Sequence, residues 1–295
     1  MIICYLCMSE SSQWQGFRHN ANILEPMEDT KVLFVTQDMI PYTAVSEIAA
    51  IARELPQYAQ EQGMEIRILM PRFGTINERR HRLHEVVRLS GINIIIDDDD
   101  YPLIIKVASL PGARMQVYFL DNDDFFKRKH IFEDKENNFY EDNAERMIFF
   151  SKGVMETVRK FGWAPDIIHC HGWMTSLIPF YLKHGYKNDP IFKNAKVVYS
   201  VFNNYFDHKL PDSFIQKATN INKGIEEVEL GSYKEGTNPS LDKGAIEFSD
   251  GVVIAGSQVN GEVRKAAEAI KKPLLELDGE RDLEQYKSFY EGLLE

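Results

Sequence analysis

The sequence is poor in cysteine, carries no excess of positive charge and contains no long apolar run. Its 295 residues include 3 cysteines, of which Cys4 and Cys7 form one Cys-x-x-Cys pair without the second pair that a zinc site needs. We therefore expect no metal, and a reducing, cytoplasmic setting. The 34 basic and 45 acidic side chains give a formal net charge of -11, which does not attract nucleic acid or anionic membranes. No segment approaches the ~18 consecutive apolar residues of a membrane span. For these two reasons we expect neither nucleic acid nor a membrane as a partner.

The first 27 residues are mostly polar and show no periodic pattern. Their only apolar cluster, at residues 2–7, has no basic residue before it and makes a poor secretion signal. We expect residues 1–27 to form a disordered extension, or to precede the native start of translation. The rest of the chain is long enough for a large core, because 44% of all residues are hydrophobic and 27% are charged. We expect residues 28–295 to form one domain.

Apolar runs typical of buried strands alternate with segments in which apolar residues recur at helical spacing. The expected strands of a parallel sheet are 31–36, 65–70, 115–120, 167–168, 196–202 and 251–255. The expected helices are 45–62, 147–161, 173–186 and 240–249, and one carrying Val259 and Val263 with Ser257 as its cap. A last apolar stripe at 283–293 either packs on the body or mediates self-association. This alternation predicts a three-layer, Rossmann-like α/β domain with a mainly parallel sheet.

Short strands without intervening helices interrupt this alternation between residues 86 and 107. They predict a small antiparallel insertion, after which the chain returns to the main sheet at 115–120. Four consecutive aspartates, Asp97 to Asp100, lie inside the insertion. Because consecutive carboxylates point in different directions, we interpret them as a solvated turn and not as a metal site.

Polar side chains follow several of the expected strands, at the edge where parallel sheets bind ligands. The stretch 164–173 contains a strand that ends in His169 and His171, which therefore point the same way. We expect His169 to hydrogen-bond its neighbours and His171, one residue further on, to take part in function. Asn203 follows the strand 196–202 in the same manner. Trp173 is equally compatible with a core position and with a ligand contact.

The segment 121–139 is rich in charged residues, Phe and Asn, and we expect it to form a loop over this edge of the sheet. Tyr140, Asp142 and Asn143 then stand at the start of a helix. A carboxylate is stabilised at a helix amino terminus. Asp142 could therefore serve the helix dipole or bind substrate, and its position favours neither reading.

Several motifs, taken in order, resemble the bacterial ADP-glucose type of glycogen and starch synthases. That family opens with a strand, an S-E-x-x-P turn, a Lys-x-Gly-Gly-Leu loop, a helix ending Leu-Pro and a strand ending Pro-Arg-Tyr-Gly. The same frame stands here at 31–41, 55–56 and 66–74. The family motifs Tyr-x-Asp-Asn, Pro-Asp-hydrophobic-hydrophobic-His-x-His-Asp-Trp, Thr-Ile-His-Asn and Lys-Gly-x-x-x-x-x-Asp correspond to 140–143, 165–173, 200–203 and 243–250. The resemblance runs from about residue 31 to about residue 262.

The resemblance implies one half of a GT-B glycosyltransferase. Such synthases have two Rossmann-type domains, of which the first holds much of the glucan acceptor site and the second most of the ADP-glucose site. We expect the sequence to end near the boundary between the first domain and the second. In the family, the residue matching His171 contacts the transferred glucose and the residue matching Asp142 lies on the acceptor side. The candidate glucan-binding residues are therefore His171, Asp142, Asn143, Trp173, Asn203 and Tyr140.

The loop that would face the donor phosphates departs from the family pattern. The family lysine falls on Ala44 and the two glycines on Ser46 and Glu47. Glycine lets backbone amides approach a pyrophosphate, and lysine adds positive charge, whereas Glu47 adds a negative charge. Two further departures are Phe202, in place of the histidine of Thr-Ile-His-Asn, and Gly172, in place of the aspartate of His-Asp-Trp.

These departures favour a glucan-binding or regulatory protein without independent transferase activity. We expect it to bind a glucan or maltooligosaccharide, to need no cofactor and to have no confidently assigned catalytic residue. The alternative is a glucosyltransferase half that works with a separate donor-domain protein and ADP-glucose. A third reading, from fold analogy alone, is a different Rossmann enzyme acting on another sugar nucleotide.

Overall fold

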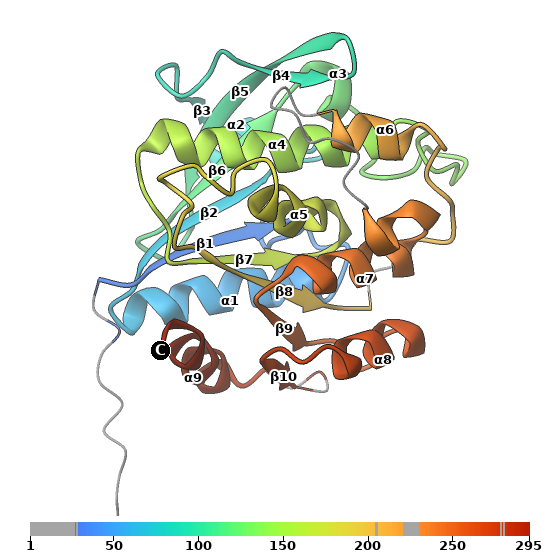
Figure 1. Cartoon of the computed structure of the whole chain (residues 1–295). Helices are drawn as coiled ribbons and strands as arrows, with labels where there is room; N and C mark the ends of the chain where they lie inside the picture. Colours follow the sequence, from blue (N-terminus) through green and yellow to red (C-terminus); the bar gives the residue numbers. More distant parts are fainter. Residues whose placement is uncertain (1–26, 28, 204–205, 221–229, 278, 280) are drawn as a thin grey trace, which may run out of the picture.

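A computed structural model of the chain describes residues 27, 29–203, 206–220, 230–277, 279 and 281–295. Its strands are β1 (Lys31–Thr36), β2 (Glu65–Pro71), β3 (His84–Glu85), β4 (Ile92–Ile96), β5 (Asp99–Ser109), β6 (Gln116–Asp121), β7 (Ile167–His171), β8 (Lys196–Val201), β9 (Gly251–Ile254) and β10 (Leu274–Glu276). Within these ranges they form one sheet in the order β10-β9-β8-β7-β1-β2-β6-β5-β3, and β4 pairs with β5 (Figure 1).

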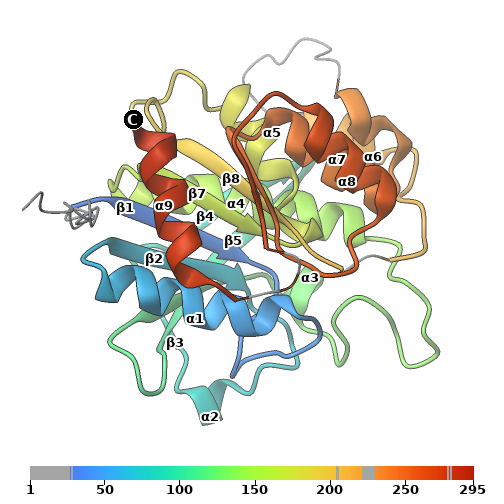
Figure 2. The same ribbon diagram turned by 90° about the horizontal axis from the view of Figure 1, so that it is seen from below.

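Helices cover both faces of this sheet. They are α1 (Ile48–Glu61), α2 (Glu78–His81), α3 (Asp123–Phe126), α4 (Asn143–Phe161), α5 (Leu177–Lys183), α6 (Phe214–Thr219), α7 (Asn238–Phe248), α8 (Gly261–Ala269) and α9 (Leu283–Leu294), with the 3-10 turns η1 (Trp173–Thr175) and η2 (Gly231–Glu235). Helices α1 and α9 lie on one face, and α4, α5 and α7 lie on the other (Figures 1 and 2). The expected three-layer α/β architecture is therefore confirmed.

The parallel strands at the centre of the sheet are aligned so that three of them end together. β1 pairs in parallel with β2 and β7, and β7 pairs in parallel with β8. In this register Thr36 is the partner of His171, which in turn is the partner of Ser200. The loops after β1, β7 and β8 therefore meet at one edge, as the sequence predicts. The apolar runs fit this place, because a central parallel strand is buried on both faces.

The antiparallel insertion is also confirmed. β5 pairs in antiparallel fashion with β3, β4 and β6, and β6 returns to pair in parallel with β2. The predicted solvated turn is right for Asp97 and Asp98. It is wrong for Asp99 and Asp100, which begin β5 and pair with the end of β4. Period alone could not find this boundary, because aspartate is rarely used inside a strand.

Three helix boundaries differ from the predictions. Helix α1 begins at Ile48 and not near Val45, whose exposed fraction is 55%. The predicted helix 173–186 is split into η1 and α5, since Pro179 has no N–H to donate to the carbonyl of Thr175. Helix α8 is capped by Asn260 and not by Ser257, because the Asn260 side chain accepts hydrogen bonds from the first-turn amides.

The carboxyl-terminal helix packs on the body of the same molecule. Tyr286 and Tyr290 of α9 are buried, and the Tyr58 hydroxyl of α1 donates to Glu284 at 2.6 Å. For the apolar stripe at 283–293 we considered packing on the body and self-association, and the structure shows packing on the body. The disordered extension expected at residues 1–27 lies outside the described residues except for Met27, and the single domain stays a prediction. None of the helices described is long and apolar enough to cross a bilayer.

Candidate functional site

The two histidines at the end of β7 share one face of the sheet but have different surroundings. His169 is fully buried; its Nδ1 lies 2.6 Å from the Tyr290 hydroxyl and its Nε2 2.7 Å from the Ser200 hydroxyl. These are the neighbour contacts that the sequence analysis expected of it. Burial and the nearby His171 ring lower the pKa of His169 well below its usual value. His169 is therefore a neutral, structural residue that connects β7, β8 and α9.

His171 is also fully buried, which leaves its predicted functional role untested. Its ring centroid lies 4.1 Å from that of His169, 6.3 Å from Phe34 and 6.0 Å from Phe202. Burial lowers the pKa of His171 to about 3, and the backbone of Val35 opposes this shift only in part. Among the described residues, no side chain hydrogen-bonds either ring nitrogen. His171 is thus a neutral, buried ring packed among Phe34, His169 and Phe202.

The loop after β1 folds around a carboxylate of the chain itself. Asp38 is fully buried, and its Oδ2 accepts hydrogen bonds from the backbone N–H of Val45 at 2.9 Å and of Ser46 at 2.8 Å. The Ser46 hydroxyl donates to the same oxygen at 3.0 Å. Converging amides of this kind are what a protein offers to a phosphate. Here Asp38 already occupies them.

Glu47 connects two of the loops at this edge. Its carboxylate accepts a hydrogen bond from the backbone N–H of Asn203 at 2.8 Å. Gly256 lies beside this contact, and a Cβ there would stand 2.5 Å from the same carboxylate oxygen. Ala44, which occupies the family lysine position, is exposed. The degenerate donor loop of the sequence analysis is therefore an acidic bridge between the segments that follow β1 and β8.

A cavity of about 310 Å³ opens at this edge, and we call it the cleft. Its loop side consists of Gln37, Val45, Ser46 and Asn203, and its aromatic side of Phe132, Glu133, Phe139, Trp173 and Phe206. Trp173 is 2% exposed and packs against Phe132 and Phe206, each at 4.9 Å between ring centroids. Trp173 thus belongs to the hydrophobic core and also lines the cleft. Among the described residues that line it, none is a lysine or arginine, and Glu133 is the one charged residue.

Asp142 is neutralised by a residue that the sequence analysis missed. Both oxygens of its carboxylate accept hydrogen bonds from the Arg128 guanidinium, one of them at 2.8 Å, and its side chain makes no hydrogen bond to the start of α4. The Arg128 guanidinium also lies 4.5 Å above the Tyr140 ring. Arg128 therefore holds Tyr140 and Asp142 together. The charge of Asp142 is paired with Arg128, and both roles considered for Asp142 stay predictions.

Asn143 positions the aromatic side of the cleft from behind. It is fully buried, its Nδ2 donates to the Phe132 carbonyl at 2.8 Å, and its Oδ1 accepts from Arg146. Arg146 is fully buried as well, and its Nε donates to the Phe125 carbonyl at 2.8 Å. Burial lowers the pKa of Arg146 to about 10. Asn143 and Arg146 thus fix the backbone of the 125–132 loop, which brings Phe132 against Trp173.

The six candidate glucan-binding residues do not share one cavity. Trp173 and Asn203 line the cleft, whereas Asp142 lines a different cavity of about 520 Å³, together with Asp124 and Lys217. His171, Tyr140 and Asn143 line neither of these two cavities. The six candidate residues therefore differ in their access to the cleft.

Gly172 is explained by its neighbour in the loop after β1. Its φ of +90° is one that residues with a Cβ rarely adopt, and a Cβ would lie 2.4 Å from the Gln37 side chain. Gln37 in turn accepts a hydrogen bond from the backbone N–H of Met174 at 3.0 Å. Gln37 therefore fills the space that a side chain at position 172 would need.

Comparison with known proteins agrees with this geometry. The profile of a protein family described as "Starch synthase catalytic domain" matches residues 31–273. A glycogen synthase of Chlorobium limicola is 40% identical over 221 residues, which are 75% of this chain and 44% of that protein. One of Chlorobium phaeobacteroides is 36% identical over 271 residues, which are 90% of this chain and 52% of that protein. The chain thus spans about half the length of the curated relatives it matches.

A solved structure shares the fold. The catalytic domain of starch synthase IV from Arabidopsis thaliana, bound to ADP and acarbose, superposes with a TM-score of 0.68 over 85% of this chain and 51% of that chain. The sequences are 20% identical over this superposition. At this identity the likeness concerns the fold alone.

Proposed function

The chain belongs to the family of starch synthase catalytic domains, and we propose that it is an acceptor-side domain that binds an uncharged glucan and does not transfer glucose by itself. One observation carries this proposal: the donors that could hold a phosphate at the sheet edge are bound to the chain's own carboxylates. Asp38 takes the amides of Val45 and Ser46, and Glu47 takes the amide of Asn203.

Glucose transfer from a sugar nucleotide needs stabilisation of the charge that develops on the leaving diphosphate. Enzymes supply it with fixed cations and amides aimed at the phosphates, and the loss of one such donor typically lowers the rate about 10²- to 10³-fold. Of the cleft residues that the structure describes, Glu133 is the one that is charged, and Glu47 adds a further negative charge beside Asn203. A pyrophosphate would therefore meet two carboxylates and no cation from this described lining. This supports a domain without transferase activity of its own.

The same lining suits a neutral sugar chain. Apolar sugar faces pack on aromatic rings, and their hydroxyls exchange hydrogen bonds with amides, hydroxyls and carboxylates. The aromatic side offers Trp173 and Phe206, and the remaining polar groups include Gln37, Asn203 and Glu133. The starch synthase IV structure contains acarbose, an oligosaccharide analogue. We extend this ligand class to the present chain as a maltooligosaccharide.

The candidate residues outside the cleft take supporting roles in this proposal. Asn143 fixes Phe132, Arg128 fixes Asp142 and Tyr140 beside the cleft, and His171 backs Phe202 from below. Direct contact between His171 and a sugar would require its ring to leave the buried position described above. We assign catalysis to none of these residues.

Two separate titrations test the proposal. Amide NMR spectra of the chain are recorded with increasing maltopentaose and, independently, with increasing ADP-glucose. We expect saturable shifts around Trp173 and Asn203 with maltopentaose, at a Kd in the millimolar range typical of weak sites. We expect no saturable shift with ADP-glucose. Tighter binding of ADP-glucose than of maltopentaose would contradict the proposal, as would fixed resonances with both.

A glucosyltransferase half that works with a separate donor-domain protein is the second candidate. The observation that favours it is that the matching relatives, named glycogen synthases, are about twice as long as the segment they share with this chain. Label from radioactive ADP-glucose entering glycogen distinguishes the two candidates. Turnover only after addition of a partner protein from the same source would support the second, and turnover by the chain alone would contradict both.

A further inference from the structure

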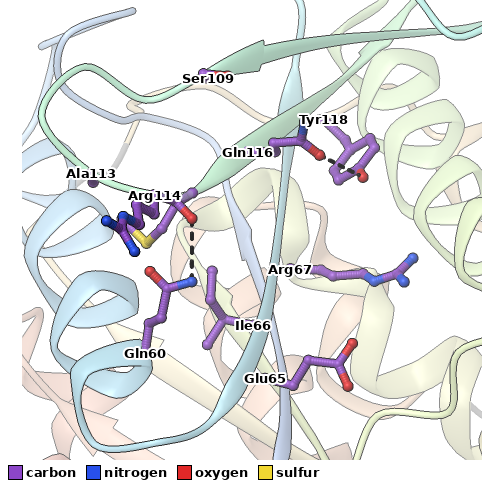
Figure 3. Close-up of a pocket in the computed structure, with 10 residues that line it drawn as sticks. Gln60, Glu65, Ile66, Arg67, Ser109, Ala113, Arg114, Gln116 and Tyr118 are labelled. Carbon is purple, nitrogen blue, oxygen red and sulfur yellow. Dashed lines mark hydrogen bonds between the residues drawn. The ribbon is translucent and has the colours of Figure 1, made fainter.

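A separate cavity of about 470 Å³ lies at the opposite edge of the sheet, where β2 and β6 begin (Figure 3). The cleft lies beyond the carboxyl ends of β1, β7 and β8, so the two cavities share no residue. The walls that matter here come from the end of α1, the start of β2 and the start of β6: Gln60, Glu65, Arg67, Arg114, Gln116 and Tyr118. No role proposed above uses any of them.

Arg67 is the distinctive residue of this cavity. Its guanidinium carbon lies 4.3 Å from the centroid of the Phe161 ring and 4.8 Å from that of Trp163. The two rings hold a planar cation in place without accepting in-plane hydrogen bonds from it. Within the described part of the chain, Arg67 forms no ion pair and donates no hydrogen bond. The rings therefore fix the orientation of the guanidinium, and its N–H groups remain free to donate hydrogen bonds to a ligand.

Glu65, the carboxylate nearest in sequence, attracts the Arg67 charge but forms no ion pair with it in the described part of the chain. Its Oε1 accepts a hydrogen bond from the indole N–H of Trp163 at 2.7 Å. Arg114 also lines the cavity, and Arg88 acts on Arg67 by charge repulsion. In a chain of net charge -11, this cavity thus combines two guanidiniums with one carboxylate, and that carboxylate is already engaged.

The arrangement of these side chains separates the cavity into two ends. In Figure 3, Arg67 and Tyr118 lie at one end, whereas Arg114 and Gln60 lie at the other, and the two guanidiniums point away from each other. Tyr118 donates to the Gln116 side-chain oxygen at 3.2 Å, which leaves the amide N–H groups of Gln116 for another partner. One anionic group can therefore be held at the Arg67 end, next to polar side chains that match hydroxyls.

We propose that this cavity binds a small phosphate ester of a hydroxylated molecule, with the phosphate at Arg67 and the body toward Gln60 and Gln116. A planar guanidinium recognises a phosphate through two parallel N–H bonds, and stacking on aromatic rings reduces the entropy lost when it does so. Side-chain amides provide both donors and acceptors for hydroxyl groups. This site is independent of the glucan cleft.

Trp163 provides a direct reporter for the test. Its indole N–H donates to Glu65 beside Arg67, so its NMR resonance responds to a charge that arrives at this end of the cavity. The resonance is assigned from a Trp163→Phe variant, and the full chain is then titrated with inorganic phosphate at constant ionic strength, with chloride as the reference anion. We expect a saturable shift at about 1 to 10 mM phosphate, which corresponds to weak but specific binding.

Variants show whether Arg67 is responsible. Arg67→Gln is expected to abolish the shift, and Arg67→Lys, which keeps the charge but not the fork, to weaken binding about tenfold. The matched control is Arg79→Gln, which removes the same charge from an exposed position on α2 and is expected to leave the titration unchanged. If Arg67→Gln does not fold, the Lys variant decides the question alone.

The ligand class is tested with a sugar phosphate and with succinate. Stronger binding of the sugar phosphate than of inorganic phosphate is expected, because Gln60 and Gln116 then contribute. Equal or stronger binding of succinate would overturn the phosphate assignment. A Trp163 shift no larger with phosphate than with chloride, or one that survives in Arg67→Gln, would overturn the site.

Discussion

The loop side and the aromatic side of the cleft face each other across one edge of the sheet, yet their polar groups are used in opposite ways. On the loop side, the amides of Val45, Ser46 and Asn203 are bound to carboxylates of the chain. On the aromatic side, Trp173 and Phe206 present rings to the cavity. On the function proposed above, the first side no longer holds a phosphate, while the second keeps a surface for a sugar. The comparison then gives a hypothesis for how a family site can lose one substrate and retain the other.

The largest expected effect comes from removing the aromatic side. Trp173→Ala should lower the free energy of unfolding by about 3 to 5 kcal/mol, as for other large buried aromatic residues, and abolish maltopentaose binding. Urea unfolding and the NMR titration measure the two effects. Trp173→Phe is the control, because it keeps a ring in the cluster and should retain part of both. Normal glucan binding by the Ala variant would remove the aromatic side from the proposal.

The histidines below the two sides predict a loss of stability in mild acid. The unfolded chain has ordinary histidine pKa values near 6.5, whereas burial lowers the pKa of His171 to about 3. The stabilisation is therefore complete above about pH 6.5 and is lost as the pH falls toward the folded-state value, with a slope of up to about 1.4 kcal/mol per pH unit for each such histidine.

Urea unfolding between about pH 7 and about pH 5 measures this slope. His171→Phe should reduce it, whereas the control His130→Gln, at an exposed position, should leave it unchanged. An identical slope in wild type and His171→Phe would contradict the neutral, buried state of His171. Glucan affinity, by contrast, should stay constant over the same pH range, because no histidine is among the described residues that line the cleft.

The loop side should depend on Asp38 for its shape. Asp38→Ala removes a charged acceptor from two amides and a hydroxyl, and hydrogen bonds to a charged group are worth about 1.5 to 3 kcal/mol. We expect a loss of stability of this size and faster hydrogen exchange at Val45 and Ser46. Asp38→Asn keeps an acceptor oxygen and should lose less. Unchanged exchange at both amides in the Ala variant would mean that the carboxylate does not organise the loop.

The smallest expected effect sharpens the contrast between the two substrates. Glu47→Gln removes a charge and keeps the oxygen that accepts from Asn203. For a solvent-exposed charge any gain in ADP-glucose affinity should stay below about 1 kcal/mol, so that ADP-glucose still gives no saturable shift, while maltopentaose affinity is unchanged. Glu61→Gln, an equal change at the far end of α1, is the control. A larger effect on maltopentaose than on ADP-glucose would reverse the assignment of the two sides.

Much of the fold could be predicted because the central strands contain consecutive apolar residues, although β7 has only two of them before its histidines. The positions of β1, β7 and β8, and hence the meeting of their loops at one edge, followed from that pattern. The complete burial of the His171 side chain could not be predicted from that pattern. Alternation along β7 predicts the face on which a side chain lies. The rings that bury His171 come from other parts of the chain, Phe34 from β1 and Phe202 from the loop after β8. Burial is set by neighbours that the local sequence does not identify.

The pairing within the candidate site was beyond sequence reasoning for a related reason. Arg128 stands in an irregular, highly charged segment, 14 residues before Asp142, and no helical or strand period relates the two. Asp38 could have been singled out as a carboxylate just before a loop that lacks its glycines. That its oxygen would accept two amides of that loop depends on a backbone turn that has no period either.

The contact between Gln37 and Gly172 also has a consequence for how this chain could change over time. In the family frame, serine stands at position 37 and aspartate at position 172. Because a Cβ at residue 172 would stand 2.4 Å from the Gln37 side chain, an aspartate there would require that side chain to move, and it would have a strained backbone φ of +90°. Moving Gln37 would remove its hydrogen bond to the backbone N–H of Met174. We therefore expect the residues at these two positions to change together.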